Sequence, residues 1–81
     1  MNIIEKLETY FKNELFYLQV GLKNEVDKEL RLRNCWYCMQ RCLGATDFAM
    51  LCGGDESAIE AMYHKTREQI IELIEAQIRG D

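Results

Sequence analysis

The sequence contains no proline and only five glycines in 81 residues. It is therefore poor in the two residues that most often interrupt helices and form tight turns. Turn-rich β folds and disordered chains are correspondingly disfavoured. The hydrophobic fraction of 48% and the charged fraction of 30% suit a folded helical protein. We expect one all-α domain, residues 1–81, near the lower size limit for a stable hydrophobic core.

Long hydrophobic runs are also missing. The longest uncharged run, Leu15–Leu22, has eight residues, whereas a membrane-spanning helix needs about 20. Glu5 and Lys6 interrupt the start of the sequence before an apolar stretch of secretory-signal length can form. We therefore expect no membrane partner and a cytoplasmic location, where cysteines stay reduced.

Basic residues are fewer than acidic ones, 10 against 14, and the formal net charge is -4. Domains that bind nucleic acid usually have the opposite excess, gathered on one face. Arg31, Arg33 and Arg41 lie in a stretch without acidic residues, but helical spacing scatters them around the helix. Nucleic acid is therefore not an expected partner. An acidic protein that mimics nucleic acid is an alternative to which this modest charge lends little support.

Catalytic signatures are absent from the sequence. It has no glycine-rich phosphate loop and no G-x-S-x-G motif. His64 is the only histidine, and its position opposite the apolar stripe of its helix predicts an exposed side chain. We expect neither an enzyme nor a bound cofactor.

Apolar residues at three- and four-residue spacing mark three amphipathic helices, at about residues 2–22, 25–52 and 56–79. Asn24 is the predicted N-cap of the second helix, and the pair Gly53-Gly54 is predicted to end it. Asp55 or Ser57 is expected to cap the third, with Ser57 opening an S-x-x-E capping box. Short turns favour antiparallel neighbours. The sequence thus predicts a three-helix antiparallel arrangement with a long central helix.

Three cysteines, Cys35, Cys38 and Cys42, fall within eight residues, and Cys52 follows ten residues later. On a helix the first three share the face that also holds Met39, Thr46 and Ala49, which indicates small core residues. A metal-binding or redox module using Cys35, Cys38 and Cys42 is the alternative. One zinc ion held by all three would require the helix to unwind, so no metal site is predicted.

Glu14 falls within the apolar stripe of the first helix, beside Leu7, Phe11 and Leu18. A carboxylate is costly to bury without a partner. We expect Glu14 either to lie at the edge of the stripe or to bind a tyrosine hydroxyl or an arginine.

The central helix has a second apolar face, away from the cysteines. Leu30, Tyr37, Gly44 and Leu51 recur at seven-residue intervals, with Phe48 beside Gly44. These five residues are the predicted interface of a homodimer, in which two copies form a larger helical bundle. The competing arrangement is a monomer whose first and third helices lie on opposite sides of the second helix and cover both faces.

These patterns favour a non-enzymatic helical interaction or regulatory protein that acts through apolar helix surfaces. The stretch Arg41–Ala45, RCLGA, resembles small helical proteins of phages and mobile elements. The likeness covers these residues alone and implies no activity, but it is consistent with an accessory role.

Overall fold

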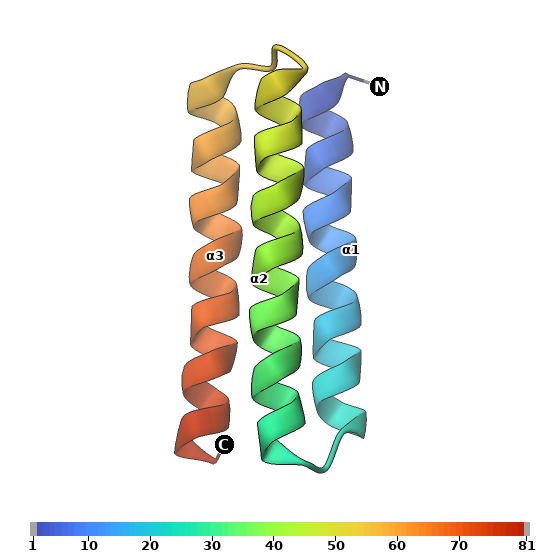
Figure 1. The fold of residues 1–81 in the computed structure, drawn as a ribbon, viewed down its shortest axis with the longest axis vertical. Helices are drawn as coiled ribbons and strands as arrows, with labels where there is room; N and C mark the ends of the chain where they lie inside the picture. Colours follow the sequence, from blue (N-terminus) through green and yellow to red (C-terminus); the bar gives the residue numbers. More distant parts are fainter. Residues whose placement is uncertain (1, 81) are drawn as a thin grey trace.

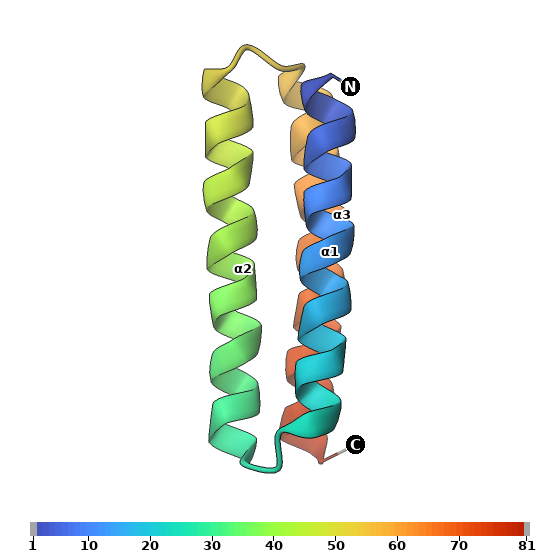
Figure 2. The ribbon, with the colours of Figure 1, turned by 90° about the vertical axis from the view of Figure 1, so that its right-hand side faces the viewer.

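A computed structural model describes residues 2–80, so the outer bounds of the predicted domain, residues 1 and 81, lie outside the described part. The described chain forms three helices, α1 (Ile3–Asn24), α2 (Lys28–Leu51) and α3 (Glu56–Arg79), and contains no strand. They run antiparallel along a bundle of 40 × 18 × 15 Å (Figure 1). Viewed from the side, α1 and α3 overlap and α2 stands apart, so the three axes form a triangle (Figure 2). The predicted all-α, three-helix antiparallel fold is confirmed.

The first turn lies three residues later than the sequence predicted. Asn24 is the last residue of α1, not the cap of α2, so that prediction was wrong. Asp27 caps α2 instead, and its carboxylate accepts hydrogen bonds from the backbone N–H groups of Glu29 at 2.9 Å and Leu30 at 3.3 Å. The reason is that Gly21 keeps a negative φ and accepts the hydrogen bond of the Glu25 N–H at 2.9 Å, so α1 continues past it.

The turn between α2 and α3 follows the predicted glycine pair. Gly53 has φ 83°, the left-handed conformation that glycine adopts without strain. Its N–H donates to the Met50 carbonyl at 3.0 Å, and the Gly54 N–H donates to the Ala49 carbonyl at 3.3 Å, which is the Schellman pattern. Of the two caps considered for α3, Asp55 is used, accepting from the Ala58 N–H at 3.2 Å. Ser57 lies inside the first turn, so the predicted capping box does not cap this helix.

The core lies between the three helices and is built from one stripe of each. The stripe of α2 contains the three clustered cysteines, all fully buried, together with Thr46 and Ala49. Facing it are aliphatic and aromatic side chains of the other two helices: Leu7, Phe11, Leu18, Ile59, Ile70 and Ile74. The prediction that the cysteine face of α2 points into the core is confirmed. Small side chains here let α2 approach both neighbours closely.

Gly54 sits where a larger residue would collide with the core. A Cβ built on Gly54 would lie 2.7 Å from Ile59 Cδ1, 3.0 Å from Ile3 Cγ2 and 3.3 Å from the Ala49 carbonyl oxygen. Because Ile59 is fully buried, it has no free space to move into. We expect Gly54→Ala to lower the free energy of unfolding by about 1–3 kcal/mol in urea denaturation.

Gly21→Ala is the matched control. A Cβ on Gly21 would meet nothing within 4 Å, and alanine in a helix interior is favoured over glycine by about 1 kcal/mol. The same denaturation experiment should therefore give a gain for Gly21→Ala. Equal effects of the two substitutions would show that the close contacts at Gly54 do not limit its side chain.

Candidate interaction surface

The five residues predicted as an interface all lie on the outside of α2. Phe48 is 64% exposed, Leu51 is more exposed still, and Leu30, Tyr37 and Gly44 are exposed as well. The alternative in which α1 and α3 lie on opposite sides of α2 is wrong, because both helices pack against its cysteine side and also contact each other. Within residues 2–80, therefore, the second apolar face of α2 is largely exposed to solvent.

Helix α1 extends this surface with residues that the sequence analysis did not assign to it. Tyr10 and Phe48 line one apolar hollow between α1 and α2, with a volume of about 380 Å³. Tyr17 and Tyr37 line a second hollow of about 120 Å³ farther along the same two helices. We call this surface the α1/α2 face and define it by six residues, three from each helix: Tyr10, Glu14, Tyr17, Tyr37, Arg41 and Phe48.

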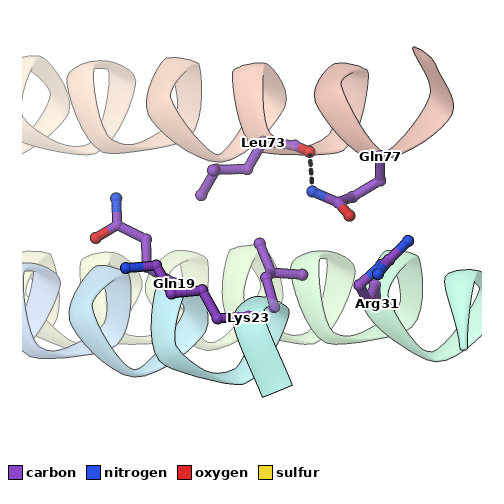
Figure 3. A pocket seen from close by; sticks show the side chains of 6 residues that line it. Gln19, Lys23, Arg31, Leu73 and Gln77 are labelled. Carbon is purple, nitrogen blue, oxygen red and sulfur yellow. Dashed lines mark hydrogen bonds between the residues drawn. The ribbon is translucent and has the colours of Figure 1, made fainter. Parts of the chain in front are cut away.

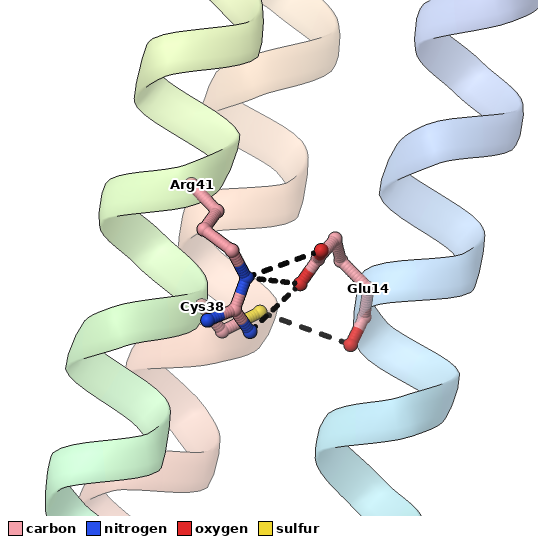
Figure 4. Close-up of polar contacts among 3 residues, drawn as sticks. All are labelled: Glu14, Cys38 and Arg41. Carbon is pink, nitrogen blue, oxygen red and sulfur yellow. Dashed lines mark hydrogen bonds and ion pairs between the residues drawn. The ribbon is translucent and has the colours of Figure 1, made fainter.

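Between the two hollows, Glu14 and Arg41 join the helices through an ion pair (Figure 4). Arg41 Nη2 lies 2.9 Å from Glu14 Oε2, and Arg41 Nε donates to both carboxylate oxygens at 3.0 and 3.2 Å. The carboxylate is mostly enclosed, with 16% of the Glu14 side chain exposed. Of the outcomes considered for Glu14, the arginine partner is the one found. This pair satisfies a charge that would otherwise be costly at the edge of the core.

The ion pair also affects the pKa values of the ionisable groups in and around it. The hydrogen bond to Glu14 raises the pKa of the Arg41 guanidinium, so that group stays charged. Burial, followed by the negative charge of Glu14, raises the pKa of the Tyr10 hydroxyl. The Arg41 guanidinium and the Tyr10 hydroxyl therefore both stay protonated throughout the neutral range.

The clustered cysteines lie beneath this face and not on it. All four cysteines are free thiols, and Cys52 alone is exposed. The Cys38 thiol donates to the Glu14 carbonyl oxygen at 3.8 Å (Figure 4). A hydrogen bond between Cys38 and Cys42 lowers the pKa of Cys38 and raises that of Cys42, while burial raises the pKa of Cys35. Among residues 2–80, no group of three or more Cys, His, Asp or Glu side chains is arranged to hold a metal ion.

The remaining residues singled out from the sequence are spread over the molecule. His64 is exposed on α3 and its ring lies 5.9 Å from that of Tyr63. Arg33 pairs with Glu29 at 3.7 Å, Arg41 pairs with Glu14, and Arg31 turns toward α3. The three arginines therefore do not share a face, as the helical spacing predicted.

None of the described helices combines the length and the apolar character needed to cross a lipid bilayer. Comparison of the chain with protein-family models, with curated proteins and with solved structures gave no match.

Proposed function

We propose that this protein is a non-enzymatic helical interaction protein that pairs with a second copy of itself through the α1/α2 face. The observation that carries the proposal is the exposure of large apolar side chains along one continuous side of the bundle. Phe48 and Tyr37 on α2 and Tyr17 on α1 are each at least half exposed. Aromatic side chains are enriched at the centres of protein interfaces, where they contribute most of the binding energy.

A second copy suits this face because the face offers both projections and hollows. A twofold interface uses the same patch on both subunits, so the patch must be complementary to itself. Phe48 and Tyr17 project, while the hollow lined by Ile3, Leu7 and Ala45 could receive a projecting ring. Gly44 lies one turn from Phe48, and its missing side chain would allow a second helix to approach closely.

The charged residues at the centre of the α1/α2 face also favour a second copy of the chain as the binding partner. Near a twofold axis each residue meets its own copy, and a lone charge there would repel itself. Here Glu14 and Arg41 neutralise each other within the chain. The centre of the face could therefore be buried against itself without an unpaired charge.

The dimensions of the bundle limit how two copies can pair. The bundle is 40 Å long and 15 to 18 Å across. A standard protein interface buries about 800 Å² on each partner, so a stable pair requires contact along most of the length of the α1/α2 face. Pairing of two copies along their whole length would produce a six-helix assembly in which the exposed apolar rows of α1 and α2 are covered.

Phe48→Asp tests this proposal. We expect wild-type protein at micromolar concentration to sediment as a dimer and Phe48→Asp to sediment as a monomer with unchanged helical circular dichroism. The expected loss of affinity is about 30-fold or more, because a central aromatic residue typically contributes about 2 kcal/mol or more to binding. The monomer should stay folded, since Phe48 is not part of the core.

Ile78→Asp is the matched control. Ile78 is 60% exposed, close to the value for Phe48, and also lies near the C-terminal end of its helix. The unfavourable interaction of a new carboxylate with the helix dipole is thus present in both variants. Ile78→Asp should remain a dimer. A wild-type protein that sediments as a monomer would overturn the proposal, as would dissociation of both variants to the same extent.

A further inference from the structure

A pocket of about 580 Å³ lies near the end of the bundle at which α1 meets α2, and residues of all three helices line it. Gln19, Leu22 and Lys23 come from α1, Arg31 from α2, and Leu73 and Gln77 from α3. None of these residues belongs to the α1/α2 face. The volume falls within the range of about 300–1,000 Å³ that small-molecule sites occupy.

The pocket contains an unsatisfied donor. The Nε atom of Arg31 is buried and has no hydrogen-bond partner within residues 2–80, whereas Nη1 of the same guanidinium donates to the Glu25 carbonyl at 3.1 Å. That bond anchors one edge of the guanidinium, whereas on the other edge Nε is enclosed and lacks an acceptor. Leaving a buried charged donor without an acceptor is unfavourable, so an acceptor at this edge would stabilise the structure.

The charged side chains that line the pocket are all positive. Lys23 and Arg31 are both cationic, and the residues that line the pocket include no carboxylate. Among the described residues Arg31 makes no ion pair, in contrast to Arg33 and Arg41. An anionic ligand would therefore meet two positive groups and no acidic side chain in the lining.

The polar groups are gathered at the ends of the pocket, with apolar side chains between them. Figure 3 shows Arg31 and Gln77 facing each other at one end, with Gln19 and Lys23 farther along. The side-chain nitrogen of Gln77 donates to the Leu73 carbonyl at 3.2 Å, which holds the amide in place. Leu22 and Leu73 supply the apolar part of the lining. Such a site suits a molecule with a charged head and an apolar body.

We propose that this pocket binds a small organic carboxylate, toward which the Arg31 side chain turns so that the enclosed Nε, together with Nη2, donates hydrogen bonds to the two carboxylate oxygens. The planar, two-oxygen carboxylate matches this edge of the guanidinium, as bidentate pairs of this kind do. The apolar body of the ligand would contact Leu22 and Leu73, and Lys23 would add attraction for the negative charge. This site is independent of the proposed pairing of two copies.

An NMR titration of isotopically labelled protein with hexanoate tests the proposal. The Arg31 Nε–H and Gln77 side-chain amide resonances should shift in a saturable way. The titration should give the same affinity in the Phe48→Asp variant, which separates this site from the dimer interface. We expect 1-hexanol, which lacks the charge, and inorganic phosphate, which lacks the apolar body, to bind at least about tenfold more weakly, since a charge-assisted hydrogen bond contributes about 1.5–3 kcal/mol.

Two variants and one control locate the site. Arg31→Met should weaken hexanoate binding at least about tenfold, whereas Arg33→Met, which changes an exposed arginine outside the pocket on the same helix, should leave it unchanged. Because Arg31 also holds the turn through Glu25, Lys23→Met provides a second variant on the exposed end of α1 and should weaken binding several-fold. Equal binding of hexanol and hexanoate, equal binding of phosphate, or unchanged affinity in both Lys23→Met and Arg31→Met would overturn the proposal.

Discussion

Ile59→Ala is expected to lower the free energy of unfolding by about 2–5 kcal/mol. Ile59 is one of the largest fully buried side chains of the described chain. It lies in the first turn of α3, directly beneath the glycine turn, where its Cδ1 atom fills the space against Gly54. The hydrogen bonds of Gly53 and Gly54 to the end of α2 hold that turn in place, so the cavity left by alanine cannot readily collapse.

The effect is large relative to the stability of so small a domain, which is typically about 5–10 kcal/mol. Urea denaturation followed by circular dichroism would measure it. Ile78→Ala is the control on the same helix, because Ile78 is largely exposed and its truncation should cost less than about 0.5 kcal/mol. Comparable losses at the two positions would contradict the packing described for the glycine turn.

The second large effect expected is a loss of stability at alkaline pH. The pKa values of Cys35 and Cys42 are raised in the folded chain. Below the ordinary thiol pKa of about 8.5, these groups are protonated in both the folded and the unfolded state, and their contribution to stability is complete. Above it, the unfolded chain releases protons that the folded chain retains, so stability must fall as pH rises.

The size of this loss follows from the number of thiols involved. Each thiol whose pKa is raised contributes about 1.4 kcal/mol per pH unit once the unfolded form is ionised. Cys38 does not add to the loss, because its pKa is lowered by the hydrogen bond with Cys42. Two thiols therefore predict a decrease of at most about 3 kcal/mol per pH unit, over the pH range in which both thiols are ionised in the unfolded chain and still protonated in the folded one. Urea denaturation under reducing conditions from pH 7 to 10 would measure the slope.

Cysteine variants show which side chains cause the decrease in unfolding free energy with pH. Cys35→Ala should remove about half of it, whereas Cys52→Ala should leave it unchanged, because Cys52 is exposed. Contributions from all other groups are common to the two variants and cancel in the comparison. If Cys35→Ala and wild type lost stability at the same rate, the buried thiol of Cys35 could not be the cause.

The fold could be predicted from the sequence because its signals are local and repeated. A stripe at three- and four-residue spacing persists for more than 20 residues in each helix, and it fixes both the helix and the face that is buried. For the same reason the burial of Cys35, Cys38 and Cys42 could be predicted. The cap of α2 could not, because Asn24 and Asp27 are both good N-cap residues. The choice between them depends on whether α1 continues past Gly21.

The surfaces could be predicted only in part, because they depend on how the helices are rotated against one another. The exposed row of α2 follows from its own spacing, so Tyr37, Gly44 and Phe48 could be found. Tyr10 and Tyr17 join the α1/α2 face because of the rotation of α1, which no pattern within α1 records. The pocket beside Arg31 likewise depends on how the three helices pack against one another. It opens where α1 and α3, which contact each other less extensively than either contacts α2, leave space between them.

The odd number of helices has a consequence for how this protein could organise other molecules. Helix α1 begins at one end of the bundle and α3 finishes at the other (Figure 1), so attachments before α1 and after α3 would be held about 40 Å apart by a rigid spacer. In a twofold pair whose axis crosses the bundle, the start of α1 in one copy would lie beside the end of α3 in the other. Each end of the dimer would then carry one segment that precedes α1 and one segment that follows α3. The two ends of the dimer would therefore be equivalent.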